Sequence, residues 1–314
     1  MATTQYPTIK DLGGTIYDVR RLVDPNDKLW SATNPSIGYS PKKGYALMLR
    51  SSNYVITGTG KYEVTTGGTI KSSIWFSELD KNWKCTNLRK IDVSKCGFDI
   101  KRGLEDPKLI WRDNAWHFTA VMMEEHTPRA RMVFGKLDPK CTKVVSLEKF
   151  PGIDSARPEK NWMLPYEPNP NFDFIYGPNA TYKDGMLSTW MTDHPDITAL
   201  RGNTNLHDLG DKTYLAVTHR MFGKADTVWV PQTFGTVNMY LRNYVHYFTR
   251  YDEEGYIIGV SRGFQFVEAG VEFAAGLTEH ENNFLVSFGR KDVSSHIASL
   301  PIELVYKSLQ PVRY

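Results

Sequence analysis

The chain has 314 residues, a formal net charge of +3, 41% hydrophobic residues and 13% aromatic residues. This length allows a large core, and an all-β protein of this size can form one domain. No run approaches the roughly 18 apolar residues of a membrane span, and the small charge neither demonstrates nor opposes a nucleic-acid partner. With no linker-like or low-complexity tract, we predict a single domain over residues 1–314 and no membrane association.

The N-terminus and the cysteines indicate a reducing compartment. Residues 1–7 lack the basic and apolar regions of a signal peptide. Cys85, Cys96 and Cys141 are odd in number and unevenly spaced, which argues against a disulfide framework and against a zinc site. We therefore expect a cytoplasmic protein.

Strand-like segments dominate the sequence. Most mix β-branched and aromatic residues with period-two alternation, and turn signals such as Asp113-Asn114 and Gly210-Asp211 divide them. In chain order the predicted strands are Tyr45–Arg50, Ser73–Glu78, Lys108–Trp111, Ala115–Met122, Arg131–Leu137, Phe172–Tyr176, Leu187–Met191, Tyr214–Thr218, Val245–Tyr251, Tyr256–Ser261 and Phe284–Phe288. No long segment has helical periodicity, so an all-β fold is predicted.

Five polar clusters each open a hairpin pattern. They are Thr33-Asn34-Pro35, Gly103-Leu104-Glu105-Asp106-Pro107-Lys108-Leu109, Glu159-Lys160-Asn161-Trp162, Arg201-Gly202-Asn203-Thr204 and Val271-Glu272-Phe273. Their unequal spacing lies near the roughly 40–50 residues of propeller repeats, although some intervals are much longer. This pattern predicts an irregular five-bladed β-propeller, with a β-sandwich as the alternative.

Counting outward from each turn predicts which residues lie side by side, because residues equidistant from a hairpin turn are neighbours. The count pairs Asn203 with Thr218, Glu272 with Lys291 and Asp106 with Val121, and it brings Asn34 within reach of residues 50–53. The polar groups then gather at the open ends of the hairpins, away from the turns. Five such hairpins would bring their polar ends to one place.

Several short motifs carry a resemblance to a known family. Glu105-Asp106-Pro107, with Glu272–Gly276 and Ser287–Asp292, resembles the five-bladed β-propeller mannoside phosphorylases and hydrolases. The set Leu-Glu-Asp-Pro, Glu-Lys-Asn-Trp, Arg-Gly-x-Thr and Ser-Phe-Gly-x-x-Asp is still more similar to a related group of glycosyltransferases on the same propeller, found in viruses and bacteria. The likeness runs from about Asn34 to Leu300, with Lys108 where Arg is usual and Ala274-Ala275 in place of a Pro-containing turn.

The resemblance implies a catalytic role for Asp106, since the Asp of a Glu-Asp-Pro-Arg motif transfers the proton in that family. Such a carboxylate can deprotonate a sugar hydroxyl or protonate a leaving oxygen. The alternative is an Asp that caps a turn. Candidate sugar-binding residues are Asn34, Glu105, Asn161, Trp162, Glu272 and Asp292. Trp162 could equally pack between blades, and Glu272 and Asp292 could pair with Arg290 or Lys291.

A basic group recurs at the open ends of several hairpins: Lys160, Arg201, His219, Arg220 and Arg290. In the resembled phosphorylases the corresponding rim holds inorganic phosphate, and a nucleotide-sugar transferase needs similar cations for the departing diphosphate. Ordinary surface salt bridges are the alternative for each residue. No Asp-x-Asp pair, P-loop or complete dinucleotide motif is present. We expect no metal and no cofactor.

Three functions follow from this pattern. The first is an inverting glycosyltransferase that moves a sugar from a nucleotide-sugar donor to a hydroxyl of a glycan, a small molecule or a hydroxymethylated DNA base. The second is a phosphorylase or hydrolase of β-linked, mannoside-like oligosaccharides, and the third is a non-catalytic propeller that binds carbohydrate or nucleic acid. We favour the first because the Glu-Lys-Asn-Trp and Arg-Gly-Asn-Thr motifs are closer to the transferase group. If the protein is viral, it acts in the host cytoplasm.

Overall fold

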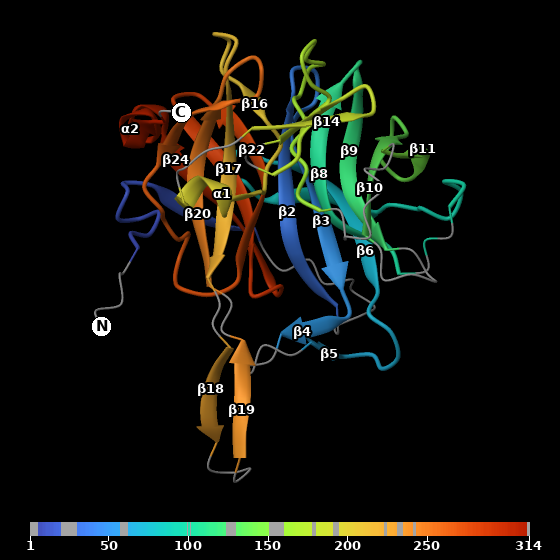
Figure 1. The fold of residues 1–314 in the computed structure, drawn as a ribbon. Helices are drawn as coiled ribbons and strands as arrows, with labels where there is room; N and C mark the ends of the chain where they lie inside the picture. Colours follow the sequence, from blue (N-terminus) through green and yellow to red (C-terminus); the bar gives the residue numbers. More distant parts are fainter. Residues whose placement is uncertain are drawn as a thin grey trace.

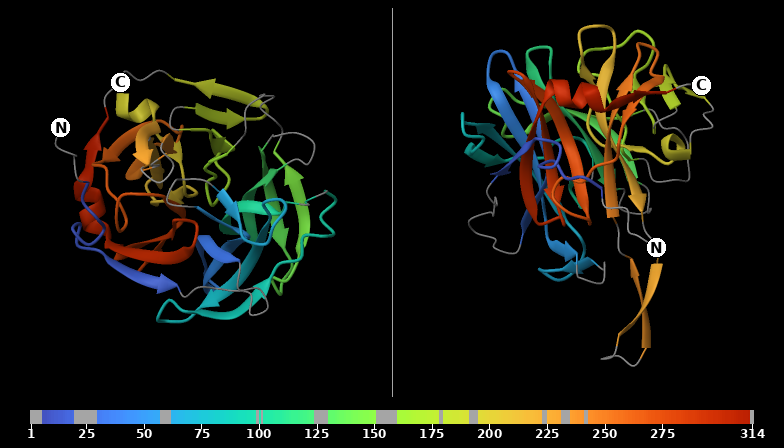
Figure 2. Two further views of the ribbon diagram at one scale, coloured as in Figure 1. Left: turned by 90° about the horizontal axis from the view of Figure 1, so that it is seen from below. Right: turned by 90° about the vertical axis from the view of Figure 1, so that its left-hand side faces the viewer.

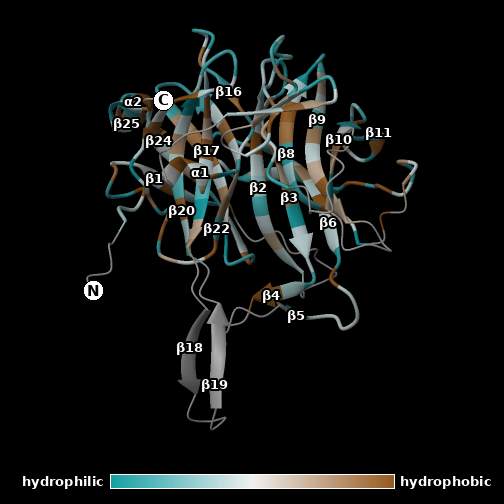
Figure 3. Ribbon diagram, in the orientation of Figure 1, coloured by the Kyte–Doolittle hydropathy of each residue, from teal (hydrophilic) through white to brown (hydrophobic). Residues whose placement is uncertain are grey.

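A computed structural model describes residues 6–19, 30–56, 62–98, 100, 102–123, 130–150, 160–177, 180–190, 195–222, 225–230, 235–240 and 243–312. The described chain forms five antiparallel blades around a central axis, which confirms the predicted all-β, five-bladed propeller (Figure 1 and Figure 2). Figure 3 shows both hydrophobic and hydrophilic residues along the strands, as expected when successive side chains point to opposite faces of a sheet.

The first two blades are four-stranded sheets in which the strand nearest the axis comes first in the chain. The first blade contains β2 (Ser31–Ser40), β3 (Gly44–Ser52), β6 (Ser72–Leu79) and β7 (Cys85–Lys90). The second contains β8 (Leu104–Arg112), β9 (Ala115–Met123), β10 (Ala130–Leu137) and β11 (Val144–Lys149). A small hairpin of β4 (Tyr54–Ile56) and β5 (Tyr62–Val64) lies between β3 and β6 in the chain. Figure 1 places this hairpin at one end of the propeller.

The third blade is the smallest. Its strands are β12 (Phe174–Ile175), β13 (Ala180–Lys183) and β14 (Met186–Thr189). The segment nearest the axis contributes a single bridge, Met163 to Ile175, with N···O distances of 3.1 and 2.9 Å. Helix α1 (Pro195–Thr198) follows the blade.

Strands from both ends of the described chain complete the last two blades. The fourth blade contains β15 (Arg201–Gly202), β16 (His207–Asp208), β17 (Tyr214–Phe222), β20 (Asn243–Tyr251), β21 (Ile257–Ser261) and β25 (Leu309–Pro311). A hairpin of β18 (Ala225–Val230) and β19 (Gly235–Tyr240) separates β17 from β20. The fifth contains β22 (Glu272–His280), β23 (Asn283–Arg290), β24 (Ser294–Pro301) and, on its outer edge, β1 (Thr15–Val19). Helix α2 (Ile302–Ser308) links β24 to β25.

An apolar cluster fills each interface between neighbouring blades. Between the first two blades, for example, Met48 and Phe76 pack with Trp116 and Phe118, all at most 2% exposed. Comparable clusters join the second to the third, the third to the fourth, the fourth to the fifth and the fifth to the first blade. Each buried side chain of this size stabilises the fold by roughly 1.5–3 kcal/mol. The clusters therefore fix neighbouring blades against each other, and with them the inner strands whose ends lie at the axis.

The observed register differs from the predicted register by one residue in three hairpins. The structure pairs Glu105 with Val121, Gly202 with Thr218 and Glu272 with Arg290. The reason is visible in β8 and β22, where bulges between Glu105 and Lys108 and between Ala274 and Gly276 shift the count. In the first hairpin Thr33 pairs with Arg50, so Asn34 lies within reach of Arg50 as predicted.

Four of the predicted site residues share a left-handed backbone conformation. Asn34, Asp106, Asn161 and Asp292 have φ of 45°, 49°, 65° and 53°, and each belongs to a different blade. Asn and Asp tolerate this region better than other residues with a side chain, and strained backbone is concentrated at functional sites. The bulges at Asn34 and Asp106, each followed by Pro, interrupt the sheet ladder where a polar side chain is needed.

We expect Gly103→Ala to destabilise the fold strongly, because Gly103 fixes the approach of the Glu105-Asp106 segment. Gly103 has φ +81°, and a Cβ there would overlap the carbonyl oxygen of Ser72. Gly210→Ala is the matched control, since Gly210 has φ +80° and nothing within 4 Å of an added Cβ. Urea unfolding should show a cost of roughly 1–2 kcal/mol for the control and a clearly larger cost for Gly103→Ala. Equal costs would contradict the close approach.

Candidate functional site

A cavity of about 320 Å³ opens on the axis at the end of the propeller that carries β4. Figure 2, left, looks onto this end. All five blades contribute to its lining, which comprises Asn34, Arg50, Tyr54, Ile56, Ile70, Glu105, Asp106, Met123, Lys160, Asn161, His219, Tyr244, Val271, Phe273 and Asp292. The predicted convergence of polar hairpin ends therefore occurs for Asn34, Glu105, Asp106, Lys160, Asn161, His219 and Asp292.

Asp106 is a carboxylate held in its ionised form. Its Oδ1 accepts a hydrogen bond from Asn34 Nδ2 at 2.7 Å and pairs with Arg50 Nη1 at 3.1 Å. Burial alone would raise the pKa of Asp106, but the charges of Arg50 and Lys160 and the hydrogen bonds from Asn34 and Arg50 lower it below the ordinary value. An ionised carboxylate in a sugar-sized cavity can accept a proton from a hydroxyl group.

Arg50 is the buried cation beneath this carboxylate. Its guanidinium pairs with Glu105 at 3.2 Å and with Asp106 at 3.1 Å, and its Nε donates to Ser72 Oγ at 2.9 Å. Burial would lower the pKa of Arg50, but the attraction of Glu105 and Asp106 outweighs burial and raises it. Arg50 therefore stays charged and fixes both carboxylates in orientation.

A hydrogen-bonded relay links Asp106 to a second carboxyl group, Asp292. Thr33 Oγ1 donates to Asn34 Oδ1 at 2.9 Å and lies 3.5 Å from Asp292 Oδ1, while Tyr54 Oη donates to Asp292 Oδ2 at 3.0 Å. Burial raises the pKa of Asp292 despite the opposing charge of Arg50. The pKa values of the two carboxyl groups are thus shifted in opposite directions, a pattern by which active sites give two acids different roles.

His219 lies in the cavity wall as a neutral imidazole. Burial, aided by the charges of Arg201 and Lys108, lowers the pKa of His219 to about 3. The side-chain amide of Asn203, with its nitrogen directed to His219 Nδ1 and its oxygen accepting from Ala274 N at 3.3 Å, satisfies both partners. In this arrangement Nδ1 accepts a hydrogen bond and Nε2 carries the proton, so His219 serves as a hydrogen-bond donor and not as a base.

Lys108, the residue found where Arg is usual in the resembled motif, is buried at 2% exposure. Its Nζ donates to the carbonyl oxygen of Trp162 at 2.6 Å. Burial lowers the pKa of Lys108 to about 7, with the charge of Asp106 acting in the opposite direction. Lys108 therefore connects the second blade to the third beneath the cavity and does not line it.

Two predicted sugar-binding residues lie away from the cavity. Trp162 is fully buried and stacks on Phe174 with ring centroids 3.8 Å apart. Glu272 is 1% exposed, and its carboxylate accepts hydrogen bonds from the backbone N–H groups of Phe266, Val267 and Glu268 at 2.7–3.2 Å. In this geometry Trp162 packs in the blade core and Glu272 orders the segment before β22.

Three predicted cations also lie outside the cavity lining. Arg290 pairs with Glu268 at 2.5 Å, and the guanidinium of Arg220 lies 4.6 Å from the Phe222 ring centroid. Arg201 is exposed and donates to the carbonyl oxygen of Leu200 at 2.8 Å. Arg201 nevertheless pairs across β15 and β17 with His219, which lines the cavity, so Arg201 lies beside the cavity and its charge lowers the pKa of the His219 imidazole. Lys160 lines the cavity, 3.5 Å from Glu105 Oε2.

Sequence reasoning named no role for several lining residues. Arg50 lies in the stretch 50–53 that the hairpin count had only brought near Asn34, and Tyr54 comes directly after that stretch. Tyr244 and Phe273 flank His219, with ring centroids 5.0 and 5.9 Å away. The available signal for Arg50 was its place opposite Thr33 in the first hairpin. Glu159 and residues 124–126, which also lie near the predicted hairpin ends, are outside the described residues.

Solved structures similar to this chain are carbohydrate-active propellers. A β-1,2-mannobiose phosphorylase from Listeria innocua aligns with a TM-score of 0.61 and 14% identity over 94% of this chain and 99% of its own. A GDP-Man-dependent mannosyltransferase from Leishmania mexicana aligns with a TM-score of 0.55 and 12% identity over 91% and 90%. A mannose phosphorylase from the same organism, solved with a phosphate ion, gives 0.55 and 10% over 96% and 93%.

These likenesses establish the shared propeller fold, at identities that leave the activity of this chain open. No protein-family model and no curated protein sequence matches the chain. In the described part of the chain, the helices are too short or too polar to cross a membrane.

Proposed function

We propose that this protein is an inverting glycosyltransferase that uses a phosphorylated sugar, in the first instance a nucleotide sugar, as its donor. Asp106 takes the proton of the acceptor hydroxyl while the oxygen of that hydroxyl attacks the anomeric carbon. The bond from that carbon to the donor phosphate breaks on the opposite face, and the phosphate group leaves with the electron pair. The single observation that carries this proposal is the ionised Asp106 carboxylate on the cavity wall.

The ionisation state of Asp106 favours transfer from a phosphorylated donor over hydrolysis. A glycosidase must protonate a sugar oxygen as it leaves, and its acid accordingly has a raised pKa. The pKa of Asp106 is instead lowered by Arg50 and Lys160. A phosphate leaving group needs no proton at neutral pH, so a base alone suffices.

The remaining lining suits a sugar and its phosphate. Glu105, Asn161 and Asp292 offer acceptors for hydroxyl groups, and the neutral His219 offers a donor at Nε2. Lys160 in the cavity and Arg201 beside it supply positive charge for the departing group. The volume of about 320 Å³ lies at the small end of the roughly 300–1,000 Å³ of ligand pockets, so the nucleotide part of the donor would extend beyond the cavity toward Arg201.

A specific observation favours a second candidate, a β-mannoside phosphorylase. Within the described lining, the charge of Arg50 is already offset by Glu105 and Asp106, which leaves Lys160 as the cation with more than a third of its side chain exposed. One such cation matches a single phosphate better than a diphosphate. In the synthetic direction of a phosphorylase, Asp106 would again act as the base.

A donor panel distinguishes the two candidates. We expect nucleotide sugars to be consumed with inversion at the anomeric carbon, followed by product mass spectrometry and NMR. We also expect a nucleoside diphosphate at 100 times its Kd to stabilise the protein by about 2.7 kcal/mol. Stabilisation by inorganic phosphate alone, with turnover of a sugar 1-phosphate, would replace the transferase by the phosphorylase. No turnover with either donor class would leave a binding propeller.

A further inference from the structure

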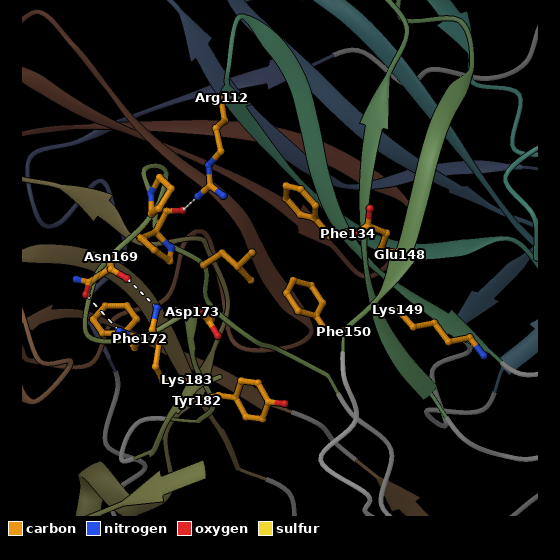
Figure 4. A pocket seen from close by; sticks show the side chains of 13 residues that line it. Arg112, Phe134, Glu148, Lys149, Phe150, Asn169, Phe172, Asp173, Tyr182 and Lys183 are labelled. Atoms are coloured by element: carbon orange, nitrogen blue, oxygen red, sulfur yellow. Dashed lines mark hydrogen bonds and ion pairs between the residues drawn. The ribbon is translucent and has the colours of Figure 1, made fainter. Parts of the chain in front are cut away.

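A second cavity of about 340 Å³ lies between the second and third blades and shares no residue with the axial one. Its lining comes from the end of β8, from β10 and β11, from residues 164–173 and from β13. The cavity exists because the third blade is small: β12 and β13 have two and four residues, whereas β10 beside them has eight. Figure 4 shows the side chains that surround it.

Aromatic rings form one wall of this second cavity. Phe134 and Phe150 are half-buried, with ring centroids 6.2 Å apart and planes at 67°. Phe150 packs on Phe174, which stacks on Tyr182 at 4.6 Å. Figure 4 shows Phe134 and Phe150 on one side of the cavity and Tyr182 at its far end. Phe134 also stacks on His117, with ring centroids 5.3 Å apart and planes at 9°. The parts of Phe134 and Phe150 that line the cavity can pack against flat, partly apolar ligands such as sugar rings.

Arg112 supplies a positive charge at the opposite end. Its Nε and Nη2 donate to the carbonyl oxygens of Tyr166 and Pro165 at 2.8 and 2.7 Å, and its guanidinium carbon lies 6.0 Å from the Phe134 ring centroid. No carboxylate of the described residues lies within ion-pair distance of it, and burial lowers the pKa of Arg112 despite the charges of Glu167 and Asp113. The Nη1–Nη2 edge of the guanidinium is left for a bidentate anion.

Polar groups at the rim suit hydroxyl groups. The carboxylates of Glu148 and Asp173 line the cavity, and Asp173 is also 3.2 Å from Lys183 Nζ. Carboxylate oxygens accept hydrogen bonds from sugar hydroxyls, and a lysine donates to ring or hydroxyl oxygens. An apolar ligand would make no hydrogen bonds to these polar groups or to Arg112, whereas a bare anion would make no contact with the aromatic wall.

We propose that this cavity binds a sugar ring that carries a carboxylate, with the ring against Phe134 and Phe150 and the carboxylate on Arg112. The site is independent of the axial cavity and of the activity proposed for it. A carboxylate fits because its two oxygens match the free edge of one guanidinium, and its single negative charge is balanced by Arg112 alone, whereas a phosphate monoester carries up to two charges.

Binding of methyl glucuronide tests the proposal, with methyl glucoside, acetate and inorganic phosphate as the comparison ligands, each titrated by calorimetry. We expect the glucuronide to bind at least about tenfold more tightly than each comparison ligand, and Arg112→Gln to weaken it by about tenfold or more, as expected for loss of a charge-assisted pair. Phe150→Leu should weaken the binding of both the glucuronide and the glucoside. Arg250→Gln is the matched control. Arg250 lies on β20, outside the lining of this cavity, and pairs with Asp211, so this variant should bind each ligand with wild-type affinity.

The same titration in Asp106→Asn separates the two cavities, since binding between the blades should persist there. Four results would overturn the proposal: no glucuronide binding to the wild type, equal binding of the glucoside, binding of acetate or phosphate as tight as the glucuronide, or unchanged binding in a folded Arg112→Gln. If Arg112→Gln fails to fold, Phe150→Leu decides in its place, and unchanged glucuronide affinity in that variant contradicts the aromatic wall.

Discussion

Asp106→Asn will reduce turnover by roughly 10²–10⁴-fold, the usual contribution of a positioned general base, while the fold and donor binding are retained. The substitution replaces the carboxylate, which can accept a proton, by a neutral amide of nearly the same shape. Asn also tolerates the left-handed backbone at φ 49°, as Asn34 does at φ 45° in the neighbouring blade. The loss should therefore appear in kcat, with the dissociation constant of the donor nearly unchanged.

A matched variant makes this experiment specific. Asp184→Asn removes an exposed carboxylate that has nearly the same backbone angle, φ 48°, and lies outside both cavities, and it should leave turnover at the wild-type level. If Asp106→Asn keeps turnover within a few-fold of the wild type on a donor that the wild type consumes, Asp106 is not the base. The axial cavity would then still bind the sugar, but a different residue would take the proton from the acceptor hydroxyl.

Arg50→Met will destabilise the protein by roughly 3–5 kcal/mol, the cost of leaving a buried ion-pair partner uncompensated. Arg50 is 4% exposed and neutralises both Glu105 and Asp106. Met has a similar length and packs without a charge, so the lost stability measures the cost of leaving the Glu105 and Asp106 carboxylates without their cation. Chemical denaturation at neutral pH measures the change in the free energy of unfolding.

Two further variants interpret that result. Arg250→Met removes a more exposed arginine that pairs with Asp211 and should cost no more than about 1 kcal/mol. Combining Arg50→Met with Glu105→Gln and Asp106→Asn removes the uncompensated charges and should restore a large part of the lost stability. A triple variant as unstable as Arg50→Met alone would show that Arg50 acts through packing.

The fold was predictable from the sequence because strand periodicity and turn residues repeat along the whole chain. Asp113-Asn114 forms the turn between β8 and β9, and Gly210-Asp211 lies in the turn between β16 and β17, both as predicted. Convergence of Asn34 and Asp106 followed from counting outward from such turns. The exact register did not follow, because a bulge adds a residue without a sequence signal that the count can detect.

The chemistry of individual side chains was less predictable, since it depends on distant neighbours. Nothing local to Arg290 indicates its pairing with Glu268, and nothing local to Glu272 indicates that three backbone N–H groups surround its carboxylate. Arg50 could not be recognised as the counter-ion of Asp106 without the packing of the first blade on the second. A left-handed Asn or Asp lines the axial cavity in four blades, and this recurrence emerges only from the backbone angles.

The pairing of β1 with β24 has a consequence for how the protein is made. During synthesis the strand at residues 15–19 leaves the ribosome early, yet its partner at residues 294–301 emerges only after almost all of the other blades. Such a sequence separation slows folding, because the ring must come together before its last seam yields any stabilising contact. The nascent chain therefore leaves β1 without its partner strand until residues 294–301 have been synthesised, and we expect chaperone binding or high temperature to affect the yield of folded protein most in that interval.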